Sequence, residues 1–421
     1  MRGGRMSLMY ELLLKCTKCG LCQQVCPTYQ VSKNEMDLAR GRVRLARLVA
    51  ENKYKWQSQI VHSVETCLQC GACVESCPSA VKTDMIMNLA KRDINKVKKP
   101  HAISQFIYKK MLTNPKMLKF IGEFTRYYLK IKDKKVLRFF NKLNPIEEVR
   151  RLEQGLPAYK EDLPLLPGKA HVTLKIGYFR NCANLAVFNS LAQATLKVVR
   201  GSGAQVEYLS NKCCGAPHWF SGDIQTFEEL AKYNINNVEF NNYDIIITDC
   251  ATCGGILKKY GELLDTVEAK AFSDKVMDIN EFLIKYGIPD NFSYKTRDDI
   301  VTVHDPCHLG RGQKITIEPR KVVSAIPGTI LKEMKNSNWC CGGAGVYSVM
   351  QPKMSDQILR AKINNILDTS ANVVLASCPS CIMQITRGVK LFAPSYHIQV
   401  LHPIEYLAQN IMNNNIKRQT S

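Results

Sequence analysis

The sequence predicts a multidomain α+β protein in which a small helical domain is joined by a basic helical connector to two similar α/β lobes with parallel sheets. Three observations predict this architecture. One cysteine run occurs twice near the start, a cysteine-free stretch rich in lysine and arginine follows, and the remainder alternates apolar strands with helices while repeating a second cysteine pattern. We place the four parts at residues 1–100, 101–168, 169–297 and 298–421.

The first part contains two copies of the pattern Cys-x-x-Cys-x-x-Cys-x-x-x-Cys-Pro. Bacterial ferredoxins bind two cubane 4Fe–4S clusters with such runs, so we expect a helical ferredoxin-type domain holding two clusters. The first three thiols of a run bind one cluster, and the fourth binds the other. The predicted ligands are Cys16, Cys19, Cys22 and Cys77 for cluster 1, and Cys67, Cys70, Cys73 and Cys26 for cluster 2. Zinc is the alternative, but its sites usually separate paired Cys-x-x-Cys motifs by longer segments.

Between the two runs, residues 37–52 place apolar side chains at helical spacings and predict a helix that separates the cluster loops. The polar face of this helix carries Arg40, Arg42, Arg44 and Arg47. Two interpretations stay open: the face is simply solvated, or it docks an acidic partner.

The second part is strongly basic. From His101 to Asn144 the only acidic residues are Glu123 and Asp133, and aromatic and aliphatic residues are interleaved with many lysines and arginines. This combination resembles basic amphipathic helices that lie in a membrane interface. The alternative is a helical connector that packs its apolar side on the core of the protein itself. A loop punctuated by proline and glycine follows at residues 156–168 and predicts a domain boundary.

The last two parts alternate strands and helices, which favours parallel sheets covered by helices. The expected strands are Val172–Phe179, Gln205–Leu209, Asp244–Thr248, Asp299–His304 and Asn372–Ala376, with helices such as Leu185–Val199, Thr226–Asn237 and Met354–Leu367 between them.

Each lobe carries five cysteines, placed just after expected strand ends, where open α/β sheets form their sites. They are Cys182, Cys213, Cys214, Cys250 and Cys253 in the first lobe, and Cys307, Cys340, Cys341, Cys378 and Cys381 in the second. Thiolates suit iron–sulfur clusters and zinc. Five thiols exceed the four that a cubane or a structural zinc uses, and an adjacent pair fits a tetrahedral cage poorly. Buried cysteines or regulatory disulfides are the alternative.

Small and polar residues accompany these cysteines. Gly215, Gly342 and Gly343 follow the adjacent pairs, where the lack of a side chain lets the backbone approach an inorganic centre. The neighbouring polar residues are His218, His304, Asp305 and His308. Each either donates hydrogen bonds to cluster sulfurs and relays protons, or has a structural role, which is the role we expect. No catalytic residue is assigned.

Composition narrows the class of protein further. The chain has 421 residues, is 45% hydrophobic and contains 18 cysteines. We expect no cleaved signal peptide, so the cysteines indicate thiolate ligands in the reducing cytoplasm. No apolar run reaches the ~18–20 residues of a spanning helix, so we expect a soluble protein or one peripheral to the cytoplasmic face of the membrane.

The formal net charge of +21 calls for an acidic partner or an anionic membrane surface. Nucleic acid is not expected, because no recognisable nucleic-acid module accompanies the charge. No Gly-x-Gly-x-x-Gly motif follows an expected strand, so we expect no flavin or nicotinamide in this chain.

The motifs carry a resemblance over nearly the whole chain. They read CGLCQQVCPTYQ with EMDLARGR, CLQCGACVESCPSAV, CCGAPHWFSGD, VTVHDPCHLGRGQK with EPR, and CCGGAGVYSVMQP. Two ferredoxin runs followed by two CCG domains resemble the iron–sulfur subunit of glycolate oxidase, the D subunit of heterodisulfide reductase and the C subunit of anaerobic glycerol-3-phosphate dehydrogenase. The detail is most similar to the glycolate oxidase subunit.

The resemblance implies an iron–sulfur electron-transfer subunit. An FAD-binding partner would oxidise a 2-hydroxyacid such as glycolate or D-lactate, and electrons would leave toward quinone or another carrier. In one respect the chain departs from glycolate oxidase subunits, whose last pair commonly reads Asn-Pro-Gly-Cys, whereas Cys378-Pro-Ser-Cys381 is complete here. Complete motifs resemble heterodisulfide reductase and imply two further, non-cubane 4Fe–4S clusters. The alternative function is therefore catalytic disulfide reduction, and a third is an interaction scaffold with structural clusters.

Overall fold

The N-terminal domain is a cluster of short helices around two cysteine-bearing loops. In the computed structural model, the described residues are 3–98, 106–131, 147–157, 174–287, 293–345 and 347–412. The helices of the first segment, which we call the cluster domain, are α1 (Gly3–Leu14), α2 (Cys22–Val25), α3 (Pro27–Ser32), η1 (Glu35–Asp37), α4 (Ala39–Ala50), α5 (Ser58–Glu65), α6 (Ala72–Glu75) and α7 (Thr83–Val97). Leu13, Ala46, Val64 and Ile86 from α1, α4, α5 and α7 form its apolar core. The helix expected over residues 37–52 is therefore present as α4 after one 3-10 turn.

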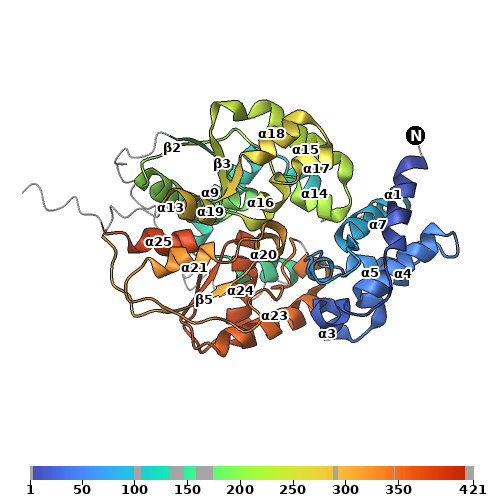
Figure 1. Cartoon of the computed structure of the whole chain (residues 1–421). Coiled ribbons are helices and arrows are strands. Elements are labelled where there is room, and N and C mark those ends of the chain that lie inside the picture. Colours follow the sequence, from blue (N-terminus) through green and yellow to red (C-terminus); the bar gives the residue numbers. More distant parts are fainter. Residues whose placement is uncertain are drawn as a thin grey trace, which may run out of the picture.

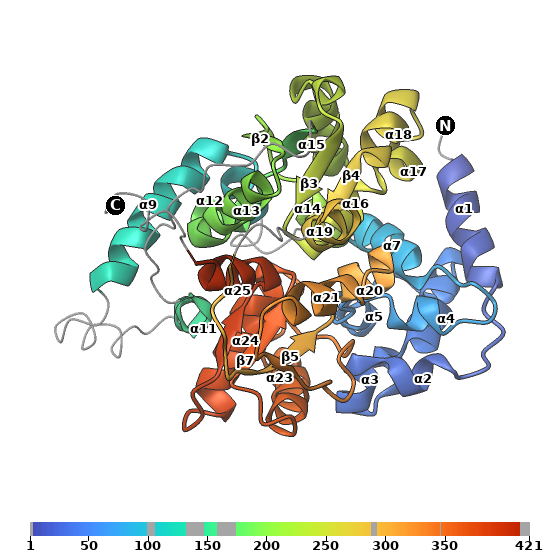
Figure 2. The ribbon, with the colours of Figure 1, turned by 60° about the vertical axis from the view of Figure 1, so that its left-hand side comes forward.

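The connector is helical where it is described, over η2 (Phe106–Met111), α9 (Pro115–Ile131) and α11 (Glu147–Gly155). One face of α9 packs on the first lobe: Leu118 is buried, and Gly122 lies so close to the carbonyl of Leu185 that any larger residue would clash. The opposite face exposes Phe120 and Phe124. The expected core-packing side and an exposed aromatic side thus coexist on one helix, and Figure 2 shows α9 lying along the first lobe. The parts of the expected connector at 101–105, 132–146 and 158–168 lie outside the described residues.

The first lobe, residues 174–287, contains a parallel sheet with the order β2-β1-β3-β4. Its strands are β1 (Lys175–Tyr178), β2 (Gln205–Tyr208), β3 (Ile245–Thr248) and β4 (Val276–Asp278). Its helices are α12 (Cys182–Ala186), α13 (Asn189–Gly201), α14 (Ala216–Ser221), α15 (Ile224–Asn237), η3 (Phe240–Asn242), α16 (Ala251–Leu257), α17 (Tyr260–Leu264), α18 (Val267–Asp274) and α19 (Ile279–Tyr286). Ile176 pairs with Val206 on one side and with Ile245 on the other.

The second lobe, residues 293–412, repeats this topology with the order β6-β5-β7-β8. Its strands are β5 (Ile300–His304), β6 (Ile330–Leu331), β7 (Val373–Ala376) and β8 (Gln399–Leu401). Its helices are α20 (Cys307–Gln313), α21 (Glu318–Ser324), α22 (Tyr347–Met350), α23 (Pro352–Leu367), α24 (Pro379–Phe392) and α25 (Pro403–Asn410). Matching orders make the two lobes a structural repeat, as the cysteine pattern predicts.

The two lobes share their apolar cores. One buried cluster joins Ile176 and Val199 of the first lobe to Val303 and Leu407 of the second. In Figure 1 the lobes lie one above the other, and the cluster domain flanks both at one end. Burial of so much common surface holds the repeat together as one unit.

The structure confirms the expected fold class and corrects some elements. The five expected strands are present with ends shifted by a residue or so where they are described, but β4, β6 and β8 are additional. The helix expected at 185–199 is broken at Val187 and Phe188, and its first part begins at Cys182.

A candidate iron–sulfur centre built from four thiol sets

The two ferredoxin-type loops have the same backbone shape. Lys18 and Gly20 have positive φ angles of 60° and 87° in the first loop, and Gln69 and Gly71 repeat them with 52° and 73° in the second. Alternation of left-handed and right-handed residues turns successive backbone N–H groups inward, which favours an anionic centre. Identical cysteine spacing has therefore produced two equivalent cradles.

Each predicted set of four cysteines lines its own hollow. Cys16, Cys19, Cys22 and Cys77 line one, and Cys26, Cys67, Cys70 and Cys73 line the other. Cys73 also borders the first hollow, so the two lie side by side. The fourth thiol of each run thus crosses to the hollow of the other run, in the interleaved arrangement expected of a two-cluster ferredoxin.

Arg42 corrects the interpretation of the α4 polar face. Its side chain is only 2% exposed and points into the cluster domain, whereas Arg44 is exposed and Arg40 and Arg47 pair with carboxylates near the surface. A helix turns about 100° per residue, so Arg40 and Arg44, two positions away from Arg42, lie about 200° round the helix and face the surface. Arg42 is therefore neither a solvated nor a docking residue.

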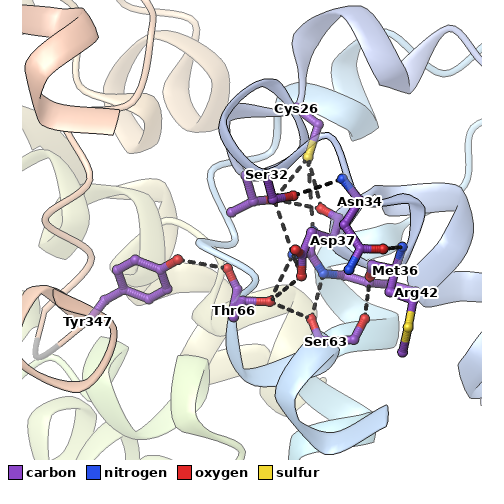
Figure 3. A network of polar contacts seen from close by, with 10 residues as sticks. Cys26, Ser32, Asn34, Met36, Asp37, Arg42, Ser63, Thr66 and Tyr347 are labelled. Atoms are coloured by element: carbon purple, nitrogen blue, oxygen red, sulfur yellow. Dashed lines mark hydrogen bonds and ion pairs between the residues drawn. The ribbon is translucent and has the colours of Figure 1, made fainter. Parts of the chain in front are cut away.

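Figure 3 shows where the Arg42 guanidinium is held. Its Nε donates to the Ser63 carbonyl at 2.7 Å, and its Nη2 donates to the hydroxyls of Thr28 and Thr66, each at 3.1 Å. Its Nη1 lies 3.9 Å from Cys26 Sγ. Burial works against the charge, but Cys67, Cys26 and Asp37 outweigh it and raise the pKa of Arg42 above its usual value. A permanent positive charge thus lies against the second thiol set.

In the first lobe, the three cysteine loops meet. Cys182 lies close to Cys213, and Cys214 lies close to Cys253, so that each pair shifts the pKa of its thiols. Hydrogen bonds from Cys213 and Cys253 lower the pKa of Cys214 to about 5. The thiols are packed closely enough that one is readily ionised, which is the state that binds soft metals.

The second lobe repeats the same pairs. Cys307 lies close to Cys340, and Cys341 Sγ lies 3.4 Å from Cys381 Sγ. Hydrogen bonds from Cys307 and Cys341 likewise lower the pKa of Cys340 well below its ordinary value. Buried, partly ionised thiols in a repeated arrangement fit an iron–sulfur group in each lobe.

Sequence reasoning missed how the two lobe sets meet. Cys250 and Cys378 occupy equivalent positions in the repeat and lie close together across the lobe interface, where Cys250 holds the pKa of Cys378 well below its usual range. The neighbouring backbones are also joined, since the Ala251 N–H donates to the Ser377 carbonyl at 3.0 Å. The ten lobe cysteines therefore form one continuous group, and nothing in the linear pattern signals this contact.

The cluster domain approaches the second lobe's thiols, although the first lobe follows it in sequence. Cys70 shares a buried apolar cluster with Cys340, and burial together with the neighbouring Cys340 raises the pKa of the Cys70 thiol to about 12. Tyr347 of α22 donates its hydroxyl to the Thr66 carbonyl at 3.0 Å. On the other side, Gln69 Nε2 donates to the Phe220 carbonyl of the first lobe at 3.2 Å.

The neighbouring polar residues have distinct surroundings. Asp305 is bound by both terminal nitrogens of Arg320 at 2.8 and 3.0 Å, a structural ion pair. His308 Nδ1 lies 3.1 Å from Thr252 Oγ1, which is itself 3.6 Å from Cys378 Sγ. His304 is buried against the second lobe's thiols. His218 is buried in α14.

The glycines after the cysteine pairs allow close packing of helices as well as close approach of the backbone to the thiols. Gly215 and Gly342 have φ angles of 77° and 79°, and a Cβ there would clash with Phe227 of α15 or the Ser355 carbonyl of α23. Of the three glycines, only Gly343 lies beside a thiol: a Cβ added there would be 3.4 Å from Cys341 Sγ. The expectation of close backbone approach therefore applies to Gly343, while the other two permit left-handed turns under a helix.

The fold and its clustered thiols define an iron–sulfur protein of the oxidoreductase class. Comparison with known families agrees: a 4Fe-4S dicluster domain matches residues 12–81, and a cysteine-rich domain, CCG, matches residues 176–258 and 301–386. The chain belongs to the family of iron–sulfur oxidoreductase subunits that join a dicluster domain to two CCG domains, the family predicted from its motifs.

Curated relatives extend over nearly the whole chain. A probable glycolate oxidase iron–sulfur subunit of Bacillus subtilis is 29% identical over 94% of both chains. The D subunit of the dihydromethanophenazine:CoB–CoM heterodisulfide reductase of Methanosarcina acetivorans is 27% identical over 89% of this chain and 88% of its own. Lactate utilization protein A 2 of Bacillus cereus is 26% identical over 56% of this chain and 99% of its own.

Proposed function

We propose that the chain is the electron-transfer subunit of a flavin-dependent 2-hydroxyacid dehydrogenase of the glycolate or D-lactate type. The observation that carries this proposal is the unbroken succession of thiol sets, from the Cys16 set through the Cys26 set and the second lobe to the first lobe. Bound iron–sulfur clusters supply one-electron transfer. The contribution of this chain is to hold them in that order and to tune their potentials.

The thiols divide into four proposed ligand sets. Cluster 1 takes Cys16, Cys19, Cys22 and Cys77, and cluster 2 takes Cys67, Cys70, Cys73 and Cys26. The first lobe offers Cys182, Cys213, Cys214, Cys250 and Cys253, and the second Cys307, Cys340, Cys341, Cys378 and Cys381, each for a non-cubane 4Fe–4S cluster. Anaerobic iron and sulfide analysis should then give about sixteen irons per chain, four for each cluster. A reproducible value near eight would leave the lobes without clusters.

An FAD-binding subunit is the proposed electron donor, in keeping with the glycolate oxidase and lactate utilization names among the relatives. Anaerobic purification from native cells should recover a flavoprotein bound to this chain. Addition of glycolate or D-lactate should then reduce the iron–sulfur clusters, which is seen as a loss of their visible absorbance. A native complex without such a flavoprotein would contradict the proposal.

Disulfide reduction is a second candidate, favoured by the contact between Cys250 and Cys378 and by the complete cysteine sets. The reaction takes up two electrons and two protons, breaks the S–S bond and releases two thiols. Thr252 and His308 lie at this contact as hydrogen-bonding groups that would pass the protons to the released thiolates. Purified chain that reduces a disulfide with a dye donor, in the absence of a flavoprotein, would establish this candidate over the first.

We further propose that the exposed face of α9 rests on an anionic lipid surface near the quinone acceptor. Phe120, Phe124 and Tyr127 are 70%, 66% and 64% exposed and recur at helical spacing along this face. Lys116 and Lys119 are exposed beside them. Aromatic rings over a basic helix suit the interface of an anionic bilayer. Among the described helices, none has the length and apolar character needed to cross a bilayer.

A further inference from the structure

His304 ends strand β5 and is almost fully buried, with 1% of its surface exposed. Its Nδ1 lies 3.1 Å from the Ser337 carbonyl. Because a carbonyl can only accept, Nδ1 carries the hydrogen of the neutral ring. The lone pair is then on Nε2, which has no hydrogen-bond partner among the described residues. A histidine that ligates a metal is usually fixed in this way, with its other nitrogen donating to a carbonyl or carboxylate.

The Ser337 carbonyl is itself held in place. Lys362, which is fully buried on α23, donates its Nζ to this carbonyl at 3.1 Å and to the Asn336 carbonyl at 2.8 Å. The carbonyl that orients His304 is thus fixed by a second buried donor, so the direction of the imidazole does not depend on a mobile loop.

Two thiols lie beside the imidazole. One ligand atom each from His304, Cys341 and Cys381 lie within 4.8 Å of one another, and the two sulfurs are 3.4 Å apart. Metal–sulfur bonds of about 2.3 Å and metal–nitrogen bonds of about 2.0 Å place the donors of a tetrahedral ion about 3.5–3.8 Å apart. The imidazole and either thiol therefore need little movement to bind one iron, which keeps its two other sites for the sulfides of a cluster.

The first lobe offers no such nitrogen at the same place. Counting back from the first cysteine of each set, Cys182 and Cys307, the residue equivalent to His304 is Phe179, which is buried in the apolar core. The two thiol sets of the repeat therefore differ in the residue beside them, which is a histidine in the second lobe and a phenylalanine in the first.

We propose that His304 is a nitrogen ligand, through Nε2, to one iron of the cluster held by the second lobe's thiols, beside Cys341 and Cys381. This proposal rests on the proposed binding of an iron–sulfur cluster in that lobe. The cluster there would have mixed thiolate and imidazole ligands, while the cluster in the first lobe would have thiolates alone.

The experiment uses full-length chain labelled with ¹⁵N-histidine and prepared anaerobically with its clusters. Pulsed EPR is recorded in each paramagnetic state, and iron is measured in the same samples. The expected result is a strong ¹⁵N coupling of the size given by the directly ligated histidines of Rieske centres. It should be lost in His304→Gln and kept in His397→Gln, a matched change at an exposed histidine of the same lobe.

The wild-type spectrum decides the matter even if His304→Gln fails to retain iron. Full iron content without a strong histidine coupling, or a coupling that survives in His304→Gln, would overturn the ligand assignment while leaving the electron-transfer function intact. Iron content near half of the expected value, with cluster signals from the cluster domain alone, would overturn this assignment and the proposed lobe clusters together.

Discussion

The buried guanidinium of Arg42 should raise the reduction potential of cluster 2, so Arg42→Gln should lower it. Reduction adds a negative charge to the cluster, and a nearby fixed positive charge stabilises that state. Arg42 Nη1 is 3.9 Å from Cys26 Sγ, a proposed ligand of this cluster. The variant keeps a polar side chain, although a shorter one, and removes the charge.

The size of the shift follows from the geometry. Unit charges about 4 Å apart interact by about 4 kcal/mol at an effective dielectric constant of 20. The added electron is shared over the whole cluster, so we expect the free energy of reduction to change by a quarter to a half of that value, about 1–2 kcal/mol. Since about 59 mV corresponds to 1.4 kcal/mol for one electron, we expect a fall of about 40–85 mV.

The assay is an EPR-monitored redox titration of anaerobically purified protein with full iron content. Arg44→Gln is the matched control, because Arg44 lies on the same helix but is exposed, where water and salt screen its charge. Arg42→Lys keeps the charge but cannot reproduce the contacts to Ser63, Thr28 and Thr66, so it should preserve most of the potential while lowering stability. An unchanged potential in Arg42→Gln, or an equal shift in Arg44→Gln, would refute the reasoning.

Three further predictions concern the contacts around the site. Tyr347→Phe removes a hydrogen bond between the second lobe and the cluster domain and should cost about 0.5–1.5 kcal/mol of unfolding free energy in a denaturant titration, with unchanged stability arguing against this contact. Phe120→Ser combined with Phe124→Ser should weaken sedimentation with phosphatidylglycerol vesicles at least tenfold, and equal binding by wild type and variant would contradict the membrane role of α9. Burial raises the pKa of Asp278 to about 7, above its value in the unfolded chain. The protonated carboxyl therefore stabilises the fold fully at low pH, and this contribution is lost as pH rises toward and through 7. The melting temperature of Asp278→Asn should decline less between pH 5 and 8 than that of wild type.

Local spacing made much of the protein predictable. The ferredoxin-type runs are short enough that their spacing alone fixes which thiols share a loop, and the lining of the two hollows agrees with the interleaved sets. Fully buried strands such as Ile245–Thr248 were predictable because nearly all of their residues are apolar and β-branched. The strands at Val276–Asp278 and Ile330–Leu331 were missed because they are too short to show a period.

The sequence alone determined the class of cofactor, the repeat and the helical or strand character of the longer segments, because these depend on residue type and near neighbours. Only the tertiary structure decided which distant groups meet. It turned Arg42 inward, brought Cys250 close to Cys378 across the lobe interface, and placed the cluster domain's Cys70 beside Cys340. Such contacts depend on how whole lobes pack through their shared apolar cores, and no spacing along the chain records that packing.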